Sequence, residues 1–363
     1  PVFTVVKQNP ITSIKDQNRS GTCWAYSTLS YFESEILKHT GKTYDLSEMF
    51  VANKTYMDRA TMAVRMHGDV SFSQGGSAYD VLYALQHYGI VPEGAMPAPG
   101  TLTGDSLANF GEFFDVMTPY VEAVAKSNAK KISSAWKSGL QGIIDSYIGK
   151  TPEKFTYQGK QYTPQSFCQS LGLNLDDYVT ITSYTHHPMW SKFAVEVQDN
   201  WRWPLSYNVP MDDLCKIIDN AINNGYTVAW GGDVTEDGFT RKGLGIAYDV
   251  KKVRSMAGTD ADHWFKLSKD EKKEKFDSLG VNAPEVVPTQ AMRQEAFDNW
   301  ETTDDHGMHI YGIAKDQNGK EYYMVKNSWG EYGDYKGTWY MTKAFVAYKT
   351  MAVSYTHLTL PTT

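Results

Sequence analysis

The sequence is poor in cysteine, lacks long apolar runs and has no excess of positive charge. Only Cys23, Cys168 and Cys215 occur among its 363 residues, too few for a framework of disulfides. No run of 18 or more apolar residues occurs, so we expect no transmembrane helix. A formal net charge of -7 argues against nucleic acid or an anionic membrane as the main partner. These absences leave a globular chain with a large core and one or two domains.

The first informative stretch surrounds Cys23, at the start of a segment that ends near Gly41. Its apolar residues recur at helical spacing: Trp24, Leu29, Phe32, Ile36 and Leu37. Cys23 is therefore expected on the first turn of a helix. The positive end of the helix dipole favours a thiolate there. Gln17, six residues upstream, carries an amide that can donate to a developing oxyanion. The pattern predicts a nucleophile and half of its oxyanion hole.

A second informative stretch is a predicted hairpin near the end of the chain. Asp316-Gln-Asn-Gly319 is a turn signal between two strand-like segments. Antiparallel pairing about this turn sets residue n beside residue 635 − n, roughly. His306 then lies near Asn327 from local geometry alone. An imidazole fixed by a third group is what an activated thiol needs, and we expect the Asn327 carbonyl to accept from Nδ1–H of His306.

Other histidines offer weaker alternatives. His306 and His309 are three residues apart and on a strand would point to opposite faces, which disfavours a shared metal. His186 and His187 are adjacent, and neighbouring histidines rarely bind one metal, so we expect no metal site. Cys168 and Cys215 are expected to be small buried apolar residues.

These motifs together resemble papain-like cysteine peptidases. The resemblance rests on Gln17 and Cys23-Trp24-Ala-Tyr-Ser, on Leu46-Ser-Glu48, on Gly75-Gly76 and on Asn327-Ser-Trp329-Gly. It implies an α+β papain-like fold, with a helical half and an antiparallel β half. It also implies that Gly75 and Gly76 pair with the substrate backbone, where no Cβ blocks close approach. Trp24 and Trp329 are expected to support the site, with Trp329 shielding the His306–Asn327 bond from water. One departure is Ser20, which occupies the place of a disulfide cysteine in secreted members.

Chain length points to one branch of this family. His306 follows Cys23 by 283 positions, whereas about 130–150 separate the two residues in papain-type enzymes. The extra residues, Ser20 and the Asp305-His-Gly-Met context resemble the bleomycin hydrolase and bacterial aminopeptidase C group. We therefore expect papain-like segments at 1–100 and 262–352, with a mainly helical insertion at 101–261 that also contains some strands.

The two ends of the chain carry separate expectations. The chain begins with Pro1 rather than Met, so we expect that a leader was removed or that the chain was shortened. Residues 353–363 lack the continuation expected for this group and resemble a translated sequencing adapter. We expect them to be a non-native tail that replaces the group's C-terminal arm, which in its members meets the substrate amine.

The resemblance implies a cysteine aminopeptidase that acts on peptides without a cofactor. It also implies a homohexamer in the cytoplasm, although the first residue leaves export open. Loss of the C-terminal arm would favour endopeptidase-like cleavage instead. A further alternative is a catalytically idle binding protein on the same fold, which the presence of Cys23, His306 and Asn327 disfavours.

Overall fold

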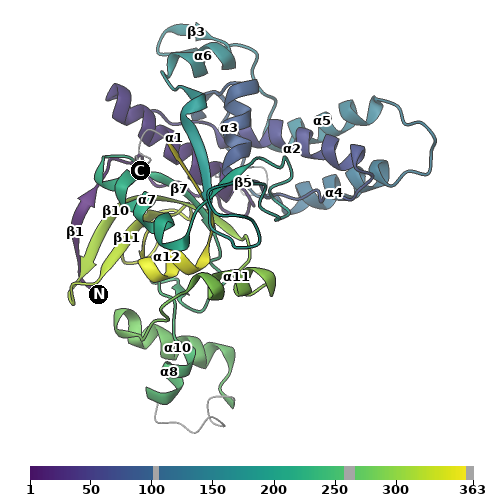
Figure 1. Cartoon of the computed structure of the whole chain (residues 1–363). Coiled ribbons are helices and arrows are strands. Elements are labelled where there is room, and N and C mark those ends of the chain that lie inside the picture. Colours follow the sequence, from purple (N-terminus) through teal and green to yellow (C-terminus); the bar gives the residue numbers. More distant parts are fainter. Residues whose placement is uncertain (101–105, 257–265, 357–363) are drawn as a thin grey trace. The chain divides into compact units, whose positions relative to one another are not determined.

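The computed structural model describes residues 1–100, 106–256 and 266–356 (Figure 1). These residues form two compact units. The helical unit comprises Ile11–Tyr178 and Ala194–Leu205, and the sheet unit comprises Pro1–Pro10, Val179–Phe193 and Ser206–Thr363. The expected α+β class is confirmed. The two units divide the chain at other positions than the expected insertion at 101–261, whose described residues contribute to both.

The helical unit is built around its first three helices. Its elements are α1 (Cys23–Thr40), α2 (Glu48–Arg65), α3 (Ala78–His87), α4 (Gly111–Ala125), α5 (Ala135–Ile148), β2 (Phe155–Tyr157), β3 (Lys160–Tyr162) and α6 (Pro164–Ser170). Helix α2 contacts α1, α3, α4 and α5. Tyr56 of α2 contacts the rings of Phe110, Phe113 and Phe114 edge-on, so aromatic packing joins α2 to the start of α4.

The ends of these helices follow from local chemistry. Helix α1 starts at Cys23, as expected, and stops at Gly41, which takes a left-handed φ of 69° that suits glycine. Helix α2 starts after Ser47, whose side chain accepts from the Phe50 amide. The helix continues to Arg65 because its later residues, including Ala60 and Ala63, remain buried in the core.

The sheet unit contains one mixed sheet of eleven strands among the described residues, in the order β5-β6-β4-β13-β7-β10-β11-β12-β9-β8, with β1 also paired to β10. The strands are β1 (Phe3–Gln8), β4 (Tyr178–Thr182), β5 (Lys192–Phe193), β6 (Ser206–Asn208), β7 (Val228–Gly232), β8 (Phe239–Thr240), β9 (Leu244–Gly245), β10 (His306–Asp316), β11 (Glu321–Lys326), β12 (Thr338–Thr342) and β13 (Thr350–Thr356). The helices are α7 (Met211–Asn223), α8 (Val250–Met256), α10 (Lys269–Leu279), α11 (Gln290–Asp298) and α12 (Lys343–Lys349).

Helices α7 and α12 pack on each other and against the sheet (Figure 1). The apolar face of α7 includes Leu214, Ile218 and Ile222, all buried in the main core of this unit. Across that core lie Trp230 of β7 and Met308 of β10. The core therefore backs the strand that begins with His306.

The predicted hairpin is confirmed, and its register is close to the expected one. His309 pairs with Lys326 and Ile310 with Val325, as 635 − n requires. Nearer the turn, Ile313 pairs with Tyr323, one residue out of step, because a bulge intervenes before Gly312. A Cβ on Gly312 would lie 2.7 Å from the Lys7 carbonyl oxygen and 2.9 Å from Met324 Sδ. Close packing of three strands thus explains both the glycine and the shift.

The expected tail begins inside a strand. Val353 pairs with Trp230 and Ser354 with Ala229 across β13 and β7, while residues 357–363 lie outside the described part of the chain. Helices α8 and α10 lie before and after residues 257–265 in the sequence, and those residues are not described. Whether 353–363 is native stays a prediction.

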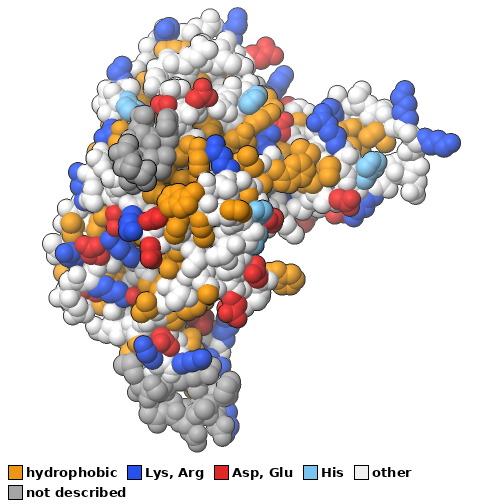
Figure 2. Space-filling model, viewed as in Figure 1, with side chains coloured by type: hydrophobic (Ala, Val, Ile, Leu, Met, Phe, Trp, Pro, Cys, Tyr) orange, Lys and Arg blue, Asp and Glu red, His pale blue; other side chains and the backbone are white. Residues whose placement is uncertain are grey.

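The surface shows no large area of a single charge sign on the face drawn in Figure 2, where Lys and Arg side chains are interspersed with Asp and Glu. In the described part of the chain, no helix has the length and apolarity needed to cross a membrane.

Candidate active site

The nucleophile candidate lies in the helical unit, on the first residue of α1. Cys23 is half-buried and forms no disulfide. The residue before the helix, Thr22, is fully buried, and its carbonyl accepts from the amides of Ala25 and Tyr26. The first turn of α1 is therefore formed at Cys23, which places the thiol where the helix dipole stabilises negative charge.

Gln17 is buried in the loop before this helix. Its Nε2 donates one hydrogen bond to the Ser20 carbonyl at 2.8 Å. This bond fixes the direction of the Gln17 carboxamide group. The geometry agrees with a donor held in a fixed direction, and its role at an oxyanion stays a prediction.

Ser20 closes the same loop through its hydroxyl. Its Oγ donates to the Gln17 carbonyl at 2.6 Å and also lies 2.6 Å from Thr22 Oγ1. Sequence reasoning noted Ser20 only as a missing cysteine. The structure shows that this side chain joins both sides of the loop that carries Gln17 and Cys23.

Trp24 and Gly76 bring the glycine pair to the start of α1. The Trp24 indole N–H donates to the carbonyls of Gly21 and Gln74, at 3.1 Å and 3.0 Å. A Cβ on Gly76 would lie 2.7 Å from the Trp24 ring. Gln74, which sequence reasoning missed, also accepts from the Gly21 amide at 2.7 Å. Trp24 therefore fixes the loop that precedes Gly76, and its role in supporting an active site stays a prediction.

His306 and Asn327 meet in the sheet unit, at the ends of β10 and β11. His306 Nε2 lies 2.8 Å from Asn327 Oδ1, and both residues are buried. The same oxygen accepts from the Ser328 amide at 2.8 Å. Two donors on one oxygen fix the orientation of the amide, so the amide in turn fixes the imidazole ring.

The nitrogen that makes this bond differs from the expected one. We expected Nδ1–H of His306 to donate to Asn327, whereas the contact uses Nε2. The hairpin register predicts which residues face each other, but the choice of ring nitrogen depends on side-chain torsions that register does not determine. Asn327 thus occupies Nε2 of His306, and proton exchange through Nδ1 stays a prediction.

Trp329 covers the imidazole. Its ring centroid lies 5.0 Å from that of His306, and its edge packs against Phe239 and Trp339. The geometry agrees with the shielding expected of Trp329. Burial lowers the pKa of His306 to about 4, although the Asn327 bond acts in the opposite direction.

The segment before His306 is tied to the end of β7 by Asp233, another residue that sequence reasoning missed. Asp233 Oδ2 accepts from the Thr303 amide at 2.9 Å, and Thr303 Oγ1 donates to Asp305 at 2.9 Å. Burial, with a hydrogen bond between Asp305 and Asp233, raises the pKa of Asp305 to about 6. These contacts set where β10 begins and so where His306 stands.

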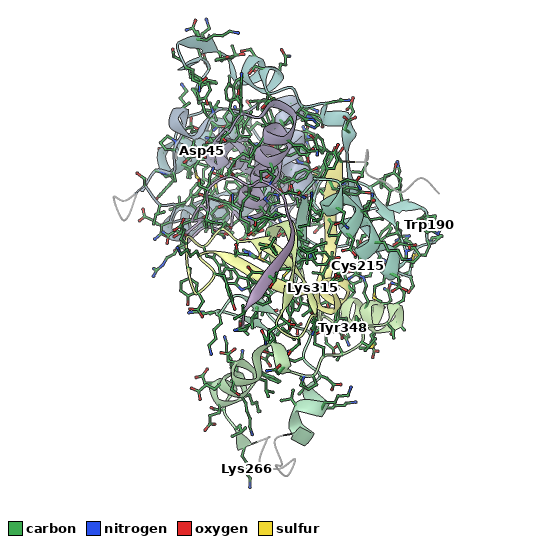
Figure 3. All side chains as sticks on the ribbon, turned by 90° about the vertical axis from the view of Figure 1, so that its left-hand side faces the viewer. Asp45, Trp190, Cys215, Lys266, Lys315 and Tyr348 are labelled. Atoms are coloured by element: carbon green, nitrogen blue, oxygen red, sulfur yellow. The ribbon has the colours of Figure 1, made fainter. Side chains whose placement is uncertain are left out.

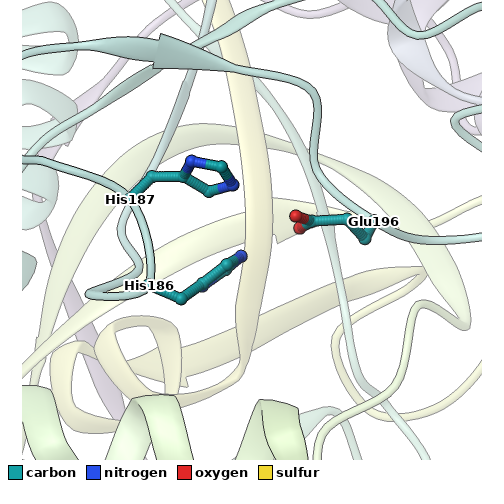
Figure 4. Close-up of side chains that lie close together, drawn as sticks. All are labelled: His186, His187 and Glu196. Carbon is teal, nitrogen blue, oxygen red and sulfur yellow. The ribbon is translucent and has the colours of Figure 1, made fainter.

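The other histidines and cysteines lie in different surroundings. His306 and His309 belong to no three-residue cluster of metal-ligand type within residues 1–100, 106–256 and 266–356, and the absence of a metal site stays a prediction. The rings of His186 and His187 lie 4.7 Å apart (Figure 4); the figure also draws Glu196, which belongs to the helical unit. His187 stacks on Phe193 at 4.2 Å.

Burial raises the pKa of both remaining thiols, Cys168 in α6 and Cys215 in α7, to about 11. Cys215 is labelled in Figure 3. Both therefore stay protonated near neutral pH. Cys168 is buried, as expected, whereas Cys215 is only half-buried.

Comparison with known proteins identifies the class to which this fold and these motifs belong. Residues 3–187, just over half of the chain, match the papain family of cysteine proteases, and the chain belongs to that family. The match ends before His306 and Asn327, so the assignment of those two residues rests on their own geometry and motif.

Bacterial aminopeptidases are among the proteins similar to this chain over most of its length. Aminopeptidase G of Lactobacillus delbrueckii subsp. lactis is 24% identical over 370 residues, which cover 92% of this chain and 78% of that protein. Aminopeptidase C of Lactobacillus helveticus is 24% identical and covers 94% and 80%. The crystal structure of PepW from Lactobacillus rhamnosis HN001 has a TM-score of 0.72 at 20% identity, over 99% of this chain and 83% of that one. The recognition as a papain-like peptidase similar to aminopeptidase C is confirmed, as is the papain-like fold.

Proposed function

We propose that this protein is a cysteine aminopeptidase that removes residues from the N-termini of peptides. The observation that carries the proposal is the buried His306–Asn327 hydrogen bond in a chain that also presents Cys23 on the first turn of α1. Similarity to aminopeptidases over nine-tenths of the chain supports the exopeptidase part.

In this mechanism the Cys23 thiolate attacks the carbonyl carbon of the scissile bond. The Cys23 amide and Gln17 Nε2 donate to the oxyanion that forms. His306 then protonates the leaving amine, and the thioester is hydrolysed by water with His306 as the base. Burial favours the neutral ring of His306, so an imidazolium persists near neutral pH only while the thiolate compensates its charge.

The test compares matched peptides with a free or an acetylated N-terminus. We expect cleavage of the free-amine peptide, about 10⁴-fold or more above the Cys23→Ala variant. Equal cleavage of the acetylated peptide would show an endopeptidase and refute the exopeptidase assignment. Turnover that persists in Cys23→Ala would refute the nucleophile, and the absence of turnover in the wild-type chain would favour an idle binding protein.

We also propose that the enzyme forms a homohexamer and is located in the cytoplasm. Both proposals rest on the family resemblance alone. Sedimentation equilibrium tests the assembly: a mass near six chains of 40.9 kDa is expected, and a concentration-independent monomer would contradict it. Fractionation of the source cells tests the compartment.

A further inference from the structure

One segment of the expected insertion belongs by its contacts to the helical unit. Residues Ala194–Leu205, here called the strap, pack in that unit although the chain on both sides of them lies in the sheet unit. Two arginines join the strap to helices α2 and α3. Arg59 of α2 pairs with Asp199 of the strap at 2.9 Å, and Arg202 of the strap pairs with Asp58 and Asp80 at 2.7 Å and 2.8 Å.

Arg59 is the more informative of the two because its side chain is 0% exposed. Its Nε and Nη2 donate to the carbonyl and hydroxyl of Ser71, at 2.9 Å and 3.0 Å. Its Nη1 donates both to the Gly75 carbonyl at 2.7 Å and to Asp199 Oδ1 at 2.9 Å. A buried guanidinium needs such partners to offset its lost hydration. Through Nη1, Arg59 links the strap to the loop that contains Gly75 and Gly76, here called the glycine loop.

Asp199 also fixes Gly75 by direct contact. A Cβ on Gly75 would lie 2.1 Å from Asp199 Oδ2, which leaves no room for any side chain. The reason for glycine here is thus the carboxylate behind it, in addition to the approach of a substrate that the sequence suggested. On the next residue, the Trp24 ring occupies the corresponding space behind Gly76.

These contacts leave the two glycines with different backbone hydrogen bonds. The Gly75 carbonyl is taken by Arg59. The amide and carbonyl of Gly76 make no hydrogen bond with another described residue, and both glycines are partly exposed. Gly76 is therefore the residue whose backbone is left to pair with an extended peptide.

We propose that Arg59 and Asp199 are positioning residues for substrate, which set the direction of the Gly75–Gly76 backbone through the strap. Neither residue contacts the reacting atoms in this proposal, and it rests on the proposed peptidase function. The ion pair acts on the binding of the peptide backbone and leaves the reactivity of Cys23 unchanged.

The test labels one thiol with two reagents. A dipeptidyl chloromethyl ketone carries a peptide backbone that reaches the glycine loop, whereas iodoacetamide carries none. In the Asp199→Asn variant we expect labelling of Cys23 by the dipeptidyl reagent to slow about 10-fold, and KM for a peptide to rise by a similar factor with kcat little changed. Labelling by iodoacetamide should stay within about 2-fold of wild type.

Asp58→Asn is the matched control. It removes a strap ion pair from the same helix, one residue from Arg59, with the same isosteric change and without a contact to Gly75. We expect it to leave the ratio of the two labelling rates unchanged. An equal ratio in Asp199→Asn and wild type, or an equal fall in Asp58→Asn, would overturn the proposal.

A second variant at Asp199 and the labelling preference of the wild-type chain separate failure of the ion-pair role from failure of folding or of the proposed function. If Asp199→Asn does not fold, Asp199→Ser tests the same contact, since this side chain is 25% exposed. If the wild-type chain neither cleaves peptides nor prefers the dipeptidyl reagent, the proposed function fails. If wild type shows that preference and the Asp199 variant keeps it, only the role of the ion pair fails.

Discussion

The two halves of the proposed active site are positioned by different kinds of bond. In the sheet unit, His306 and Asn327 stand on paired strands whose backbone ladder sets their spacing. In the helical unit, Gln17 and Cys23 stand on a loop and a helix start that side chains tie together, through Ser20 and Trp24. A side-chain substitution in a strand leaves the backbone hydrogen bonds between the strands intact. A side-chain substitution in the loop before Cys23 removes some of the hydrogen bonds that hold the loop in place.

Among the substitutions that compare how the two halves are held, the largest effect is expected from Gln17→Ala. Loss of one oxyanion donor lowers kcat by about 10²–10³-fold with KM little changed, as steady-state kinetics on a peptide would show. Gln17→Glu, which keeps the shape but not the donor, should behave alike. Because Gln17 also ties Ser20, Ser20→Ala serves as the control for a loosened loop. An equal loss of kcat in Ser20→Ala would contradict a separate role for the amide.

A smaller effect on rate is expected from Asn327→Ala. The imidazole loses the acceptor on Nε2 while the strands keep their pairing, so kcat should fall about 10²-fold, at the lower end of what acid–base catalysis contributes. The free energy of unfolding should fall as well, by about 1–3 kcal/mol, because the buried Ser328 amide loses the same acceptor. Asn318→Ala, in the turn of the same hairpin, is the control and should keep full activity. A variant at Asn327 that loses stability rather than rate would show a structural role only.

The pH dependence of stability sharpens the comparison in the sheet unit. In a Cys23→Ala chain, the pKa of His306 should lie near 4 because of burial, against about 6.5 in the unfolded chain. The unfolded chain then binds the proton first. Stability is therefore lost as the pH falls from about 6.5 to about 4, by about 3 kcal/mol at most.

Urea unfolding at several pH values measures this loss. The difference between Cys23→Ala and Cys23→Ala/His306→Gln isolates His306 from His309, whose pKa burial also lowers. In the wild-type chain a thiolate partner should raise the His306 pKa. The same low value with and without Cys23 would argue against the ion pair.

The smallest effect is expected from Ser20→Ala. The change removes the bond to the Gln17 carbonyl and leaves the buried Thr22 hydroxyl without its Ser20 partner. The cost should be about 1–3 kcal/mol in the free energy of unfolding, measured with urea. Ser20→Thr, which keeps a hydroxyl, is the matched control. No change in stability in Ser20→Ala would mean that the loop is held by other contacts.

The sequence was most informative where geometry is local. Strand alternation and the turn at Asp316–Gly319 predicted that His306 and Asn327 would meet, and the register beyond the bulge confirms the pairing. The start of α1 and its end at Gly41 were predicted because the apolar spacing and the glycine lie within a few residues of each boundary. The bulge at Gly312 was not visible, since it depends on Lys7, which is distant in sequence.

Long-range side-chain contacts could not be predicted. Arg59 lies on an amphipathic helix, where a charged residue ordinarily faces water, yet it is buried because Asp199 reaches it from a distant segment. Asp233 gave no signal for the same reason. The nitrogen of His306 that faces Asn327 was predicted wrongly, because a rotamer is chosen by packing against residues such as Trp329.

The hydrogen bonds of the Ser20 hydroxyl, which join the two sides of the loop before Cys23, have a practical consequence for handling the enzyme. Thiol peptidases are usually kept active with dithiothreitol. A high concentration of this reductant would break a disulfide that holds a loop together. Here none of the three described cysteines forms a disulfide, and the loop before Cys23 is joined by hydrogen bonds that reductants do not attack. Activity should therefore reach a plateau as the reductant concentration is increased and stay there.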